Sequence, residues 1–139
     1  MIEAIFIIIN GAYAYSRQYA QHADPTMLSG LLTALRLSSK EVSRGEFRRA
    51  QFGDSQVVFE AFPNRPETFV AVFASPTEDV NDLTRLARIT CQAFVEHSGN
   101  RLDSWTSLDG PFEDFQPTVD QVVAAGEWRA AKAPTETPH

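Results

Sequence analysis

The sequence predicts a single domain of the α/β class, of the α+β type, built on an antiparallel sheet. Two runs, residues 2–9 and 69–74, are apolar at nearly every position, as in strands covered on both faces. Two turn signals, Asn10-Gly11 and Gly53-Asp54, each separate a pair of strand-like runs. The 139 residues and 43% hydrophobic content suit one domain rather than two.

The N-terminal run predicts a central strand that returns through a hairpin. Residues 2–9 are rich in β-branched side chains, and Asn10-Gly11 favours a two-residue turn. Residues 12–19 then mix polar and apolar positions, which is typical of an edge strand. Simple alternation places three of its side chains on one face: Tyr13, Tyr15 and Arg17.

A first helix is predicted from Asp24-Pro25 to about Lys40. Aspartate is a good N-cap, and proline is tolerated at the first helical position because its missing N–H has no partner there. At about 100° per residue, one stripe is apolar and should cover the sheet: Met27, Leu28, Leu31, Leu32, Ala34 and Leu35. A second side carries mostly small residues: Thr26, Gly30, Thr33 and Leu37.

After Gly45 the pattern predicts three consecutive strands. Residues 46–52 and 55–62 flank the turn signal Gly53-Asp54, and a proline-containing loop then leads into residues 69–74. The two hairpin systems can share one sheet. Burying both all-apolar strands requires the first and fifth strands to be neighbours, so the five strands take the order 2-1-5-4-3, with the polar strands at the edges.

A long helix is predicted to begin near Ser75-Pro76-Thr77-Glu78, which has the spacing of a capping box, and to run to about Ser98. Its apolar set covers more than half its circumference, so more than the sheet must cover it. The C-terminal part can do so, with Pro117 opening a last helix. Its apolar groups are Trp105, Leu108, Phe112, Phe115, Val119, Val122 and Val123.

These elements place one helix on one face of the sheet and the long and C-terminal helices on the other. The domain is predicted to span residues 1–126. Residues 127–139 contain two prolines and little apolar pattern, which predicts a flexible tail.

No catalytic, cofactor or metal site is predicted. The single Cys91 indicates a small core residue, and the three histidines are not at ligand spacing. Glycine-rich phosphate loops and the hydrolase elbow are absent, so the chain is not itself predicted to be a GTPase or any other enzyme. Glu78, Asp79 and Asp82 suit the dipole of the long helix. A net charge of −6 argues against nucleic acid as a partner.

The order of elements resembles the longin domain of the profilin-like superfamily, which is related to roadblock proteins. The resemblance spans about residues 2–123 and is carried by the hairpin at 2–11, the helix start at 24–32, and the strand at 69–74 before a long helix. A roadblock protein would have an extra helix ahead of its first strand. The resemblance implies a non-enzymatic adaptor or scaffold in vesicle trafficking, or a regulator of a small GTPase, and transfers no individual functional residue.

Two sets of residues are predicted as protein-binding surfaces. Gly30 inside a helix costs about 1 kcal/mol relative to alanine, which suggests close approach of a partner to Thr26, Gly30, Thr33 and Leu37. An edge strand can pair with a partner's strand, here at Phe47, Arg48 and Arg49. Packing within the fold and an ordinary solvated strand end are the competing interpretations. The expected partners are a small GTPase, another longin or roadblock protein, or a second copy in a homodimer.

A PAS-like small-molecule sensor and a roadblock-like GTPase co-regulator are the alternative functions. The PAS fold shares the 2-1-5-4-3 sheet, but it normally has several short helices where this chain has one leucine-rich helix. The apolar run at 2–9 is too short to span a bilayer, so direct membrane insertion is not expected. The expected location is the cytoplasm, with any contact with a membrane made through a partner.

Overall fold

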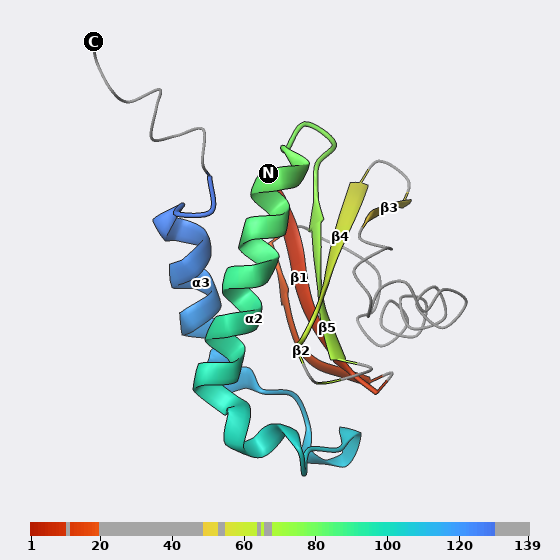
Figure 1. The fold of residues 1–139 in the computed structure, drawn as a ribbon, viewed down its shortest axis with the longest axis vertical. Coiled ribbons are helices and arrows are strands. Elements are labelled where there is room, and N and C mark those ends of the chain that lie inside the picture. The colour runs from red at the N-terminus through yellow and green to blue at the C-terminus, as the bar shows by residue number, and fades with distance from the viewer. Residues whose placement is uncertain (11, 20–48, 53–54, 64, 66–67, 130–139) are drawn as a thin grey trace.

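An antiparallel sheet forms the centre of the protein in the computed structural model, which describes residues 1–129 except 11, 20–48, 53–54, 64 and 66–67 (Figure 1). The sheet order is β2-β1-β5-β4-β3, and every pairing is antiparallel. The α+β class with an antiparallel sheet is therefore confirmed. The strands are β1 (Ile2–Ile9), β2 (Ala12–Gln18), β3 (Arg49–Phe52), β4 (Ser55–Ala61) and β5 (Thr68–Ala74).

The two central strands, β1 and β5, are neighbours, as their apolar composition predicted. Ile5 lies opposite Val72 and Ile7 opposite Val70. All residues of β5 are buried, as are all but one of β1. Strands rich in β-branched and aromatic residues are stable where both faces are covered, and here both faces are.

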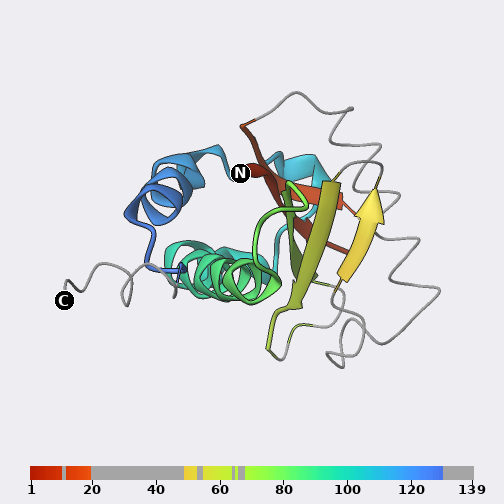
Figure 2. The ribbon, with the colours of Figure 1, turned by 90° about the horizontal axis from the view of Figure 1, so that it is seen from above.

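Two helices lie on one face of the sheet. The long helix α2 (Val80–Leu102) packs on β4 and β5, and α3 (Gln116–Ala125) packs on α2 (Figures 1 and 2). Two short 3-10 turns, η1 (Ser107–Asp109) and η2 (Glu113–Phe115), connect them. Proline lies in the first turn of α3, as predicted. The helix predicted at about 24–40 lies outside the described residues.

The start of α2 differs from the predicted capping box. Asp79 is the N-cap, and its carboxylate accepts a hydrogen bond from the amide of Asn81 at 3.2 Å. The Ser75 hydroxyl instead accepts one from the Met1 ammonium at 2.9 Å. Glu78 binds Arg129. The helix thus begins later than Ser75, and the side chains of the expected box make contacts with distant parts of the chain instead.

A β-bulge in β2 overturns the predicted alternation of Tyr13, Tyr15 and Arg17 on one face. Ile7 pairs with Tyr15 but Ile8 pairs with Tyr13, so β2 has one extra residue there, Ala14. An extra residue resets the alternation. Tyr15 is therefore buried on the helix-covered face, whereas Tyr13 packs on the opposite face.

Phe94 of α2 is the centre of the core on the helix-covered face. Its ring makes edge-to-face contacts with Phe112 and Phe115, both at 5.0 Å between centroids, and with Phe62 at 6.0 Å. Such pairs add about 0.5–1.5 kcal/mol each beyond area burial. The prediction that the C-terminal part covers the extra apolar face of α2 is thus confirmed.

The domain continues beyond its predicted end at residue 126. Gly126 ends α3 with a φ of 72°, and the chain then turns back onto α2. Trp128 is only 2% exposed, and its carbonyl accepts a hydrogen bond from Arg85 Nε at 2.9 Å. Residues 127–129 therefore belong to the folded domain rather than to a tail, because the indole fills a place in the core. Residues 130–139 lie outside the described part.

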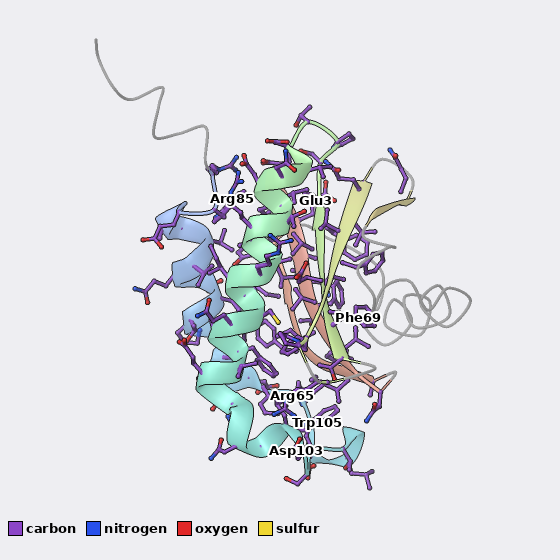
Figure 3. The ribbon with its side chains drawn as sticks, in the orientation of Figure 1. Glu3, Arg65, Phe69, Arg85, Asp103 and Trp105 are labelled. Carbon is purple, nitrogen blue, oxygen red and sulfur yellow. The ribbon has the colours of Figure 1, made fainter. Side chains whose placement is uncertain are left out.

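The opposite face of the sheet has its own apolar cluster. Phe6 contacts Phe73 edge to face at 5.6 Å, and Phe59 contacts Phe69 at 5.8 Å (Phe69 is labelled in Figure 3). All members are at most 2% exposed. They are Ala4, Phe6, Ile8, Val57, Phe59, Phe69, Ala71 and Phe73.

Candidate protein-binding site

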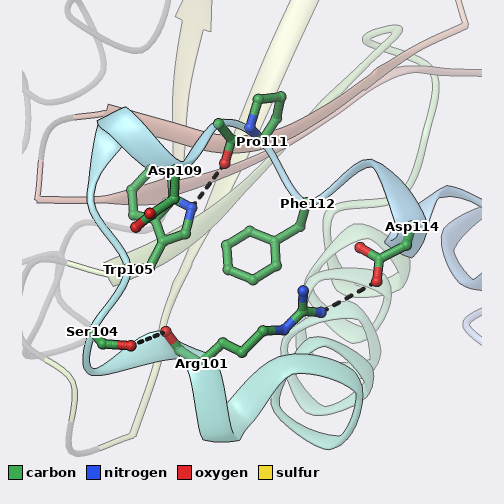
Figure 4. A pocket seen from close by; sticks show the side chains of 8 residues that line it. Arg101, Ser104, Trp105, Asp109, Pro111, Phe112 and Asp114 are labelled. Atoms are coloured by element: carbon green, nitrogen blue, oxygen red, sulfur yellow. Dashed lines mark hydrogen bonds and ion pairs between the residues drawn. The ribbon is translucent and has the colours of Figure 1, made fainter.

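The segment between α2 and α3 forms a hollow of about 320 Å³ with aromatic side chains in its lining (Figure 4). We call this hollow and its exposed turn, residues 101–114, the loop site. It follows directly from the last turn of α2, so the helix fixes its position. The lining residues are Arg101, Ser104, Trp105, Asp109, Gly110, Pro111, Phe112 and Asp114.

Aromatic rings and one arginine form the floor of the loop site. Phe112 is buried, and the Trp105 ring lies at 5.8 Å from it with a tilt of 33°. The Arg101 guanidinium stands 4.9 Å from the centre of the Phe112 ring and donates to Asp114 Oδ2 at 3.3 Å (Figure 4). The Trp105 indole N–H donates to the Gly110 carbonyl at 2.9 Å, which fixes the ring in the lining of the hollow.

Leu108 stands at the tip of the loop site and is 96% exposed. Burying a leucine side chain is worth about 1.5–3 kcal/mol, so this leucine contributes none of that to folding. The turn that carries it is internally bonded. Asp109 Oδ2 accepts from the Thr106 amide at 2.8 Å, and the Asp109 amide donates to the Thr106 carbonyl at 2.9 Å. The leucine is thus displayed on a defined frame.

Two contacts fix the loop site to the rest of the domain. The Phe112 amide donates to the carbonyl of Ala14, the bulge residue of β2, at 2.6 Å. Arg65, beyond β4, donates to Asp103 Oδ1 at 2.6 Å, and both are labelled with Trp105 in Figure 3. The sheet and α2 therefore position the aromatic floor together.

A second hollow, of about 490 Å³, lies between β4 and α2 and is mostly apolar. Cys91 lies at its inner side and is 5% exposed. Burial, with a smaller effect from Glu60, raises the pKa of its thiol to about 12, so little thiolate is present near neutral pH. This agrees with the prediction of a core cysteine. The other lining residues are Glu60, Ala61, Pro63, Arg88, Gln92, Val95 and Glu96.

A polar cluster joins β2 to α3. Asp120 Oδ1 accepts from Arg17 Nε at 2.8 Å and from the Tyr19 hydroxyl at 2.7 Å. The hydrogen bond from Arg17, and then that from Tyr19, hold the pKa of Asp120 below its usual value. Burial above all raises the pKa of Tyr19 and of Tyr15, whose hydroxyl has no hydrogen-bond partner among the described residues. The cluster ties an edge strand to the outer helix, which is a structural role.

The described part of the structure contains only one of the predicted interface residues, so it does not test them as a site. Only Arg49 lies within the described residues, as the first residue of β3 opposite Val58, and only its backbone is described. The others remain predictions outside the described part: Thr26, Gly30, Thr33, Leu37, Phe47 and Arg48.

Sequence reasoning missed the loop site because it assigned every apolar group of the C-terminal part to the core. Trp105 does pack against the core, but the assignment of Leu108 was wrong. The signal was present in the turn itself. In the sequence, Leu108 is flanked by Ser107 and by Asp109-Gly110-Pro111. These are residues typical of turns, and they offer an apolar side chain no apolar neighbour along the chain.

Within the described ranges, no three His, Cys, Asp or Glu side chains are grouped so that they could hold a metal ion. Among the helices of the same ranges, none combines the length and apolar content that crossing a bilayer requires. Comparison with known protein families gives no match. Comparison with curated proteins gives none either.

Proposed function

We propose that the protein is a non-enzymatic, longin-like interaction module, an adaptor or scaffold that binds a small GTPase or a component of membrane-traffic machinery. The observation that carries the binding role is Leu108, a 96% exposed leucine on a hydrogen-bonded turn whose next residue, Asp109, lines the aromatic hollow. A partner that covered this exposed leucine would remove its apolar surface from water, which favours binding.

The longin-like part of the proposal is supported by the order of elements and by the sheet order β2-β1-β5-β4-β3. In this arrangement α2 and α3 cover one face, and the C-terminal segment supplies the loop site at the end of α2. Fold likeness alone does not determine a partner, so the GTPase or traffic component is only what the likeness of the element order to the longin domain implies. A cytoplasmic location, with membrane contact only through that partner, belongs to the same proposal.

The binding role is tested by photo-crosslinking from the tip of the loop site. A benzophenone amino acid replaces Leu108 in the full chain, and crosslinked proteins are identified by mass spectrometry. The same substitution at Val95, which is 38% exposed on α2, is the matched control. We expect crosslinking of a defined partner from position 108 alone. The substitution Leu108→Ser should weaken the binding of that partner to the purified chain. Equal crosslinking from both positions, or binding unchanged in Leu108→Ser, would overturn the proposal.

A PAS-like small-molecule sensor is the second candidate function, and the hollow between β4 and α2 favours it. Its volume of about 490 Å³ falls within the usual range of small-molecule pockets, about 300–1,000 Å³. Native mass spectrometry of the purified chain distinguishes the two functions. A bound small molecule that is lost when Ala61 is replaced by a bulky residue would favour the sensor.

A roadblock-like co-regulator differs from the adaptor mainly in assembly, since such a role is expected to use a dimer of this chain. Sedimentation velocity over a range of concentrations separates the two. A monomer that gains mass only with its crosslinked partner supports the adaptor.

A further inference from the structure

The geometry points to a basic segment of the partner protein as the occupant of the loop site: an arginine or lysine seated on the Trp105 ring beside Asp109, with an apolar neighbour against Leu108. This inference rests on the proposed binding role and specifies its chemistry. Three observations carry it: a cation already bound in the same way within the site, the charge of the rim, and the exposed leucine.

The first observation is that the loop site already contains one cation bound over an aromatic ring. Arg101 lies over the Phe112 ring at 4.9 Å and is held by Asp114, so a ring, a guanidinium and a carboxylate stand together. Trp105 and Asp109 supply a second ring and carboxylate in the same hollow. Among the described residues, the guanidinium groups that lie over rings are those of Arg17, Arg101 and Arg129, over Tyr19, Phe112 and Trp128. A cation over a tryptophan face gains about 0.5–2 kcal/mol, more as water is excluded.

Trp105 and Asp109 are both prepared for such a ligand. The indole N–H is already bonded to Gly110, so what Trp105 contributes to the lining of the hollow is its ring and not a free donor. Asp109 uses Oδ2 for the Thr106 amide and hydroxyl, and within the described residues its Oδ1 accepts no recorded bond. A partner's guanidinium or ammonium can therefore bind Oδ1 without breaking the turn that displays Leu108.

The charge of the rim selects the sign of the occupant. Residues 101–114 contain Arg101 and four carboxylates, Asp103, Asp109, Glu113 and Asp114, which is one positive against four negative charges, or −3. Arg65 binds Asp103 and brings the local charge to −2. Charges within about 10 Å interact at moderate salt, so an approaching basic segment is attracted and an acidic one is repelled.

The same charge argues against a second copy of this chain as the occupant. A symmetric dimer through the loop site would place two such acidic rims against each other, each with a local charge of −2. Like charges facing each other across an interface cost several kcal/mol. A partner with a basic segment gains the burial of Leu108 without this repulsion.

The test selects ligands without assuming their sequence. The full chain is immobilised and panned against a phage library of random short peptides, and selected peptides are synthesised and titrated in solution. We expect an arginine or lysine next to a leucine, methionine or aromatic residue, and binding that weakens as salt is raised. Asp109→Asn keeps an acceptor for the Thr106 amide while removing the charge, and should weaken binding about five- to tenfold.

Leu108→Ser should weaken binding of the same peptides, while Glu127→Gln, a charge change at an exposed residue just beyond α3, should leave binding unchanged. Selected peptides without basic residues, no selected peptide at all, or equal affinity for Asp109→Asn would overturn the inference. So would a concentration-dependent dimer that Leu108→Ser abolishes. If a partner is crosslinked from position 108 but no basic peptide binds, only this inference is wrong. If neither experiment gives a positive result, the proposed function is wrong as well.

Discussion

Arg129 binds the carboxylate of Glu78 with both ends of its guanidinium: Nη1 donates to Oε1 at 2.9 Å and Nη2 to Oε2 at 3.1 Å. The Met1 ammonium contacts the same carboxylate. These hydrogen bonds, that of Arg129 foremost, lower the pKa of Glu78 from its ordinary value of 4.5, although burial opposes them. The contact joins the start of α2 to the segment that follows α3.

Glu78→Gln tests this contact through the dependence of stability on pH. A carboxyl group whose pKa is lowered by folding stabilises the protein fully above its ordinary pKa and loses that contribution as the pH falls below it. We therefore expect wild type to lose stability below about pH 4.5, and Glu78→Gln to be less stable by about 1–2 kcal/mol at pH 7 with a flatter acid limb. Urea unfolding at several pH values measures this, with Glu127→Gln as control.

Truncation tests where the domain ends. Removing residues 127–139 deletes the indole of Trp128, which is 2% exposed, and the Arg129 contact with Glu78. We expect the free energy of unfolding to fall by about 3–5 kcal/mol, as for other large buried aromatic groups. Truncation after Arg129 is the matched control and should cost much less. Equal losses from the two truncations would contradict the assignment of residues 127–129 to the core.

Alkaline titration tests the cluster of Tyr19, Arg17 and Asp120. Folding raises the pKa of Tyr15 and Tyr19 above their ordinary value of 10.0, by burial first and, for Tyr19, next by its hydrogen bond to Asp120. Their contribution to stability is therefore complete below pH 10 and lost as the pH rises further. Tyrosinate absorbance should show two late-titrating groups in the folded chain.

Asp120→Asn should bring the titration of Tyr19 to lower pH, because the negative partner of its hydroxyl is gone. The loss of stability at neutral pH should be about 0.5–1 kcal/mol, since Arg17 and Asp120 are both partly exposed. Tyr19→Phe identifies the group concerned. Unchanged tyrosinate absorbance in Asp120→Asn would show that burial alone protects Tyr19.

Thiol reactivity tests the burial of Cys91. A pKa of about 12 leaves almost no thiolate near neutral pH, and the side chain is 5% exposed. Reaction with an aromatic disulfide reagent should be at least about 100-fold slower in the folded chain than in the urea-unfolded chain. Cys91→Ala gives the background rate. Similar rates for the folded and unfolded chains would place the thiol at the surface of the hollow between β4 and α2.

The sequence predicted well where composition alone decides the structure. Residues 2–9 and 69–74 are apolar on both alternate faces, so only central positions suit them, and β1 and β5 are indeed neighbours. Pro117 similarly marked the start of the last helix. Both signals are local, and burial of an apolar strand leaves few alternatives.

The errors arose where a distant contact decides between two local interpretations. Ser75 and Glu78 have the spacing of a capping box, but their side chains bind Met1 and Arg129 instead. Trp128 reads as the start of a polar tail until the turn at Gly126 brings it onto α2. Leu108 reads as a core residue because an apolar side chain does not reveal whether a turn will point it outward.

The hydrogen bond from the Phe112 amide to the Ala14 carbonyl also changes the edge that β2 gives the sheet. Unoccupied backbone groups along the outer strand of a sheet recruit strands from other molecules and seed fibrils. Here the bulge turns a carbonyl of β2 toward the loop site, which occupies it. The segment that carries Leu108 thereby covers one of the backbone groups through which this edge of the sheet could add a strand of another molecule.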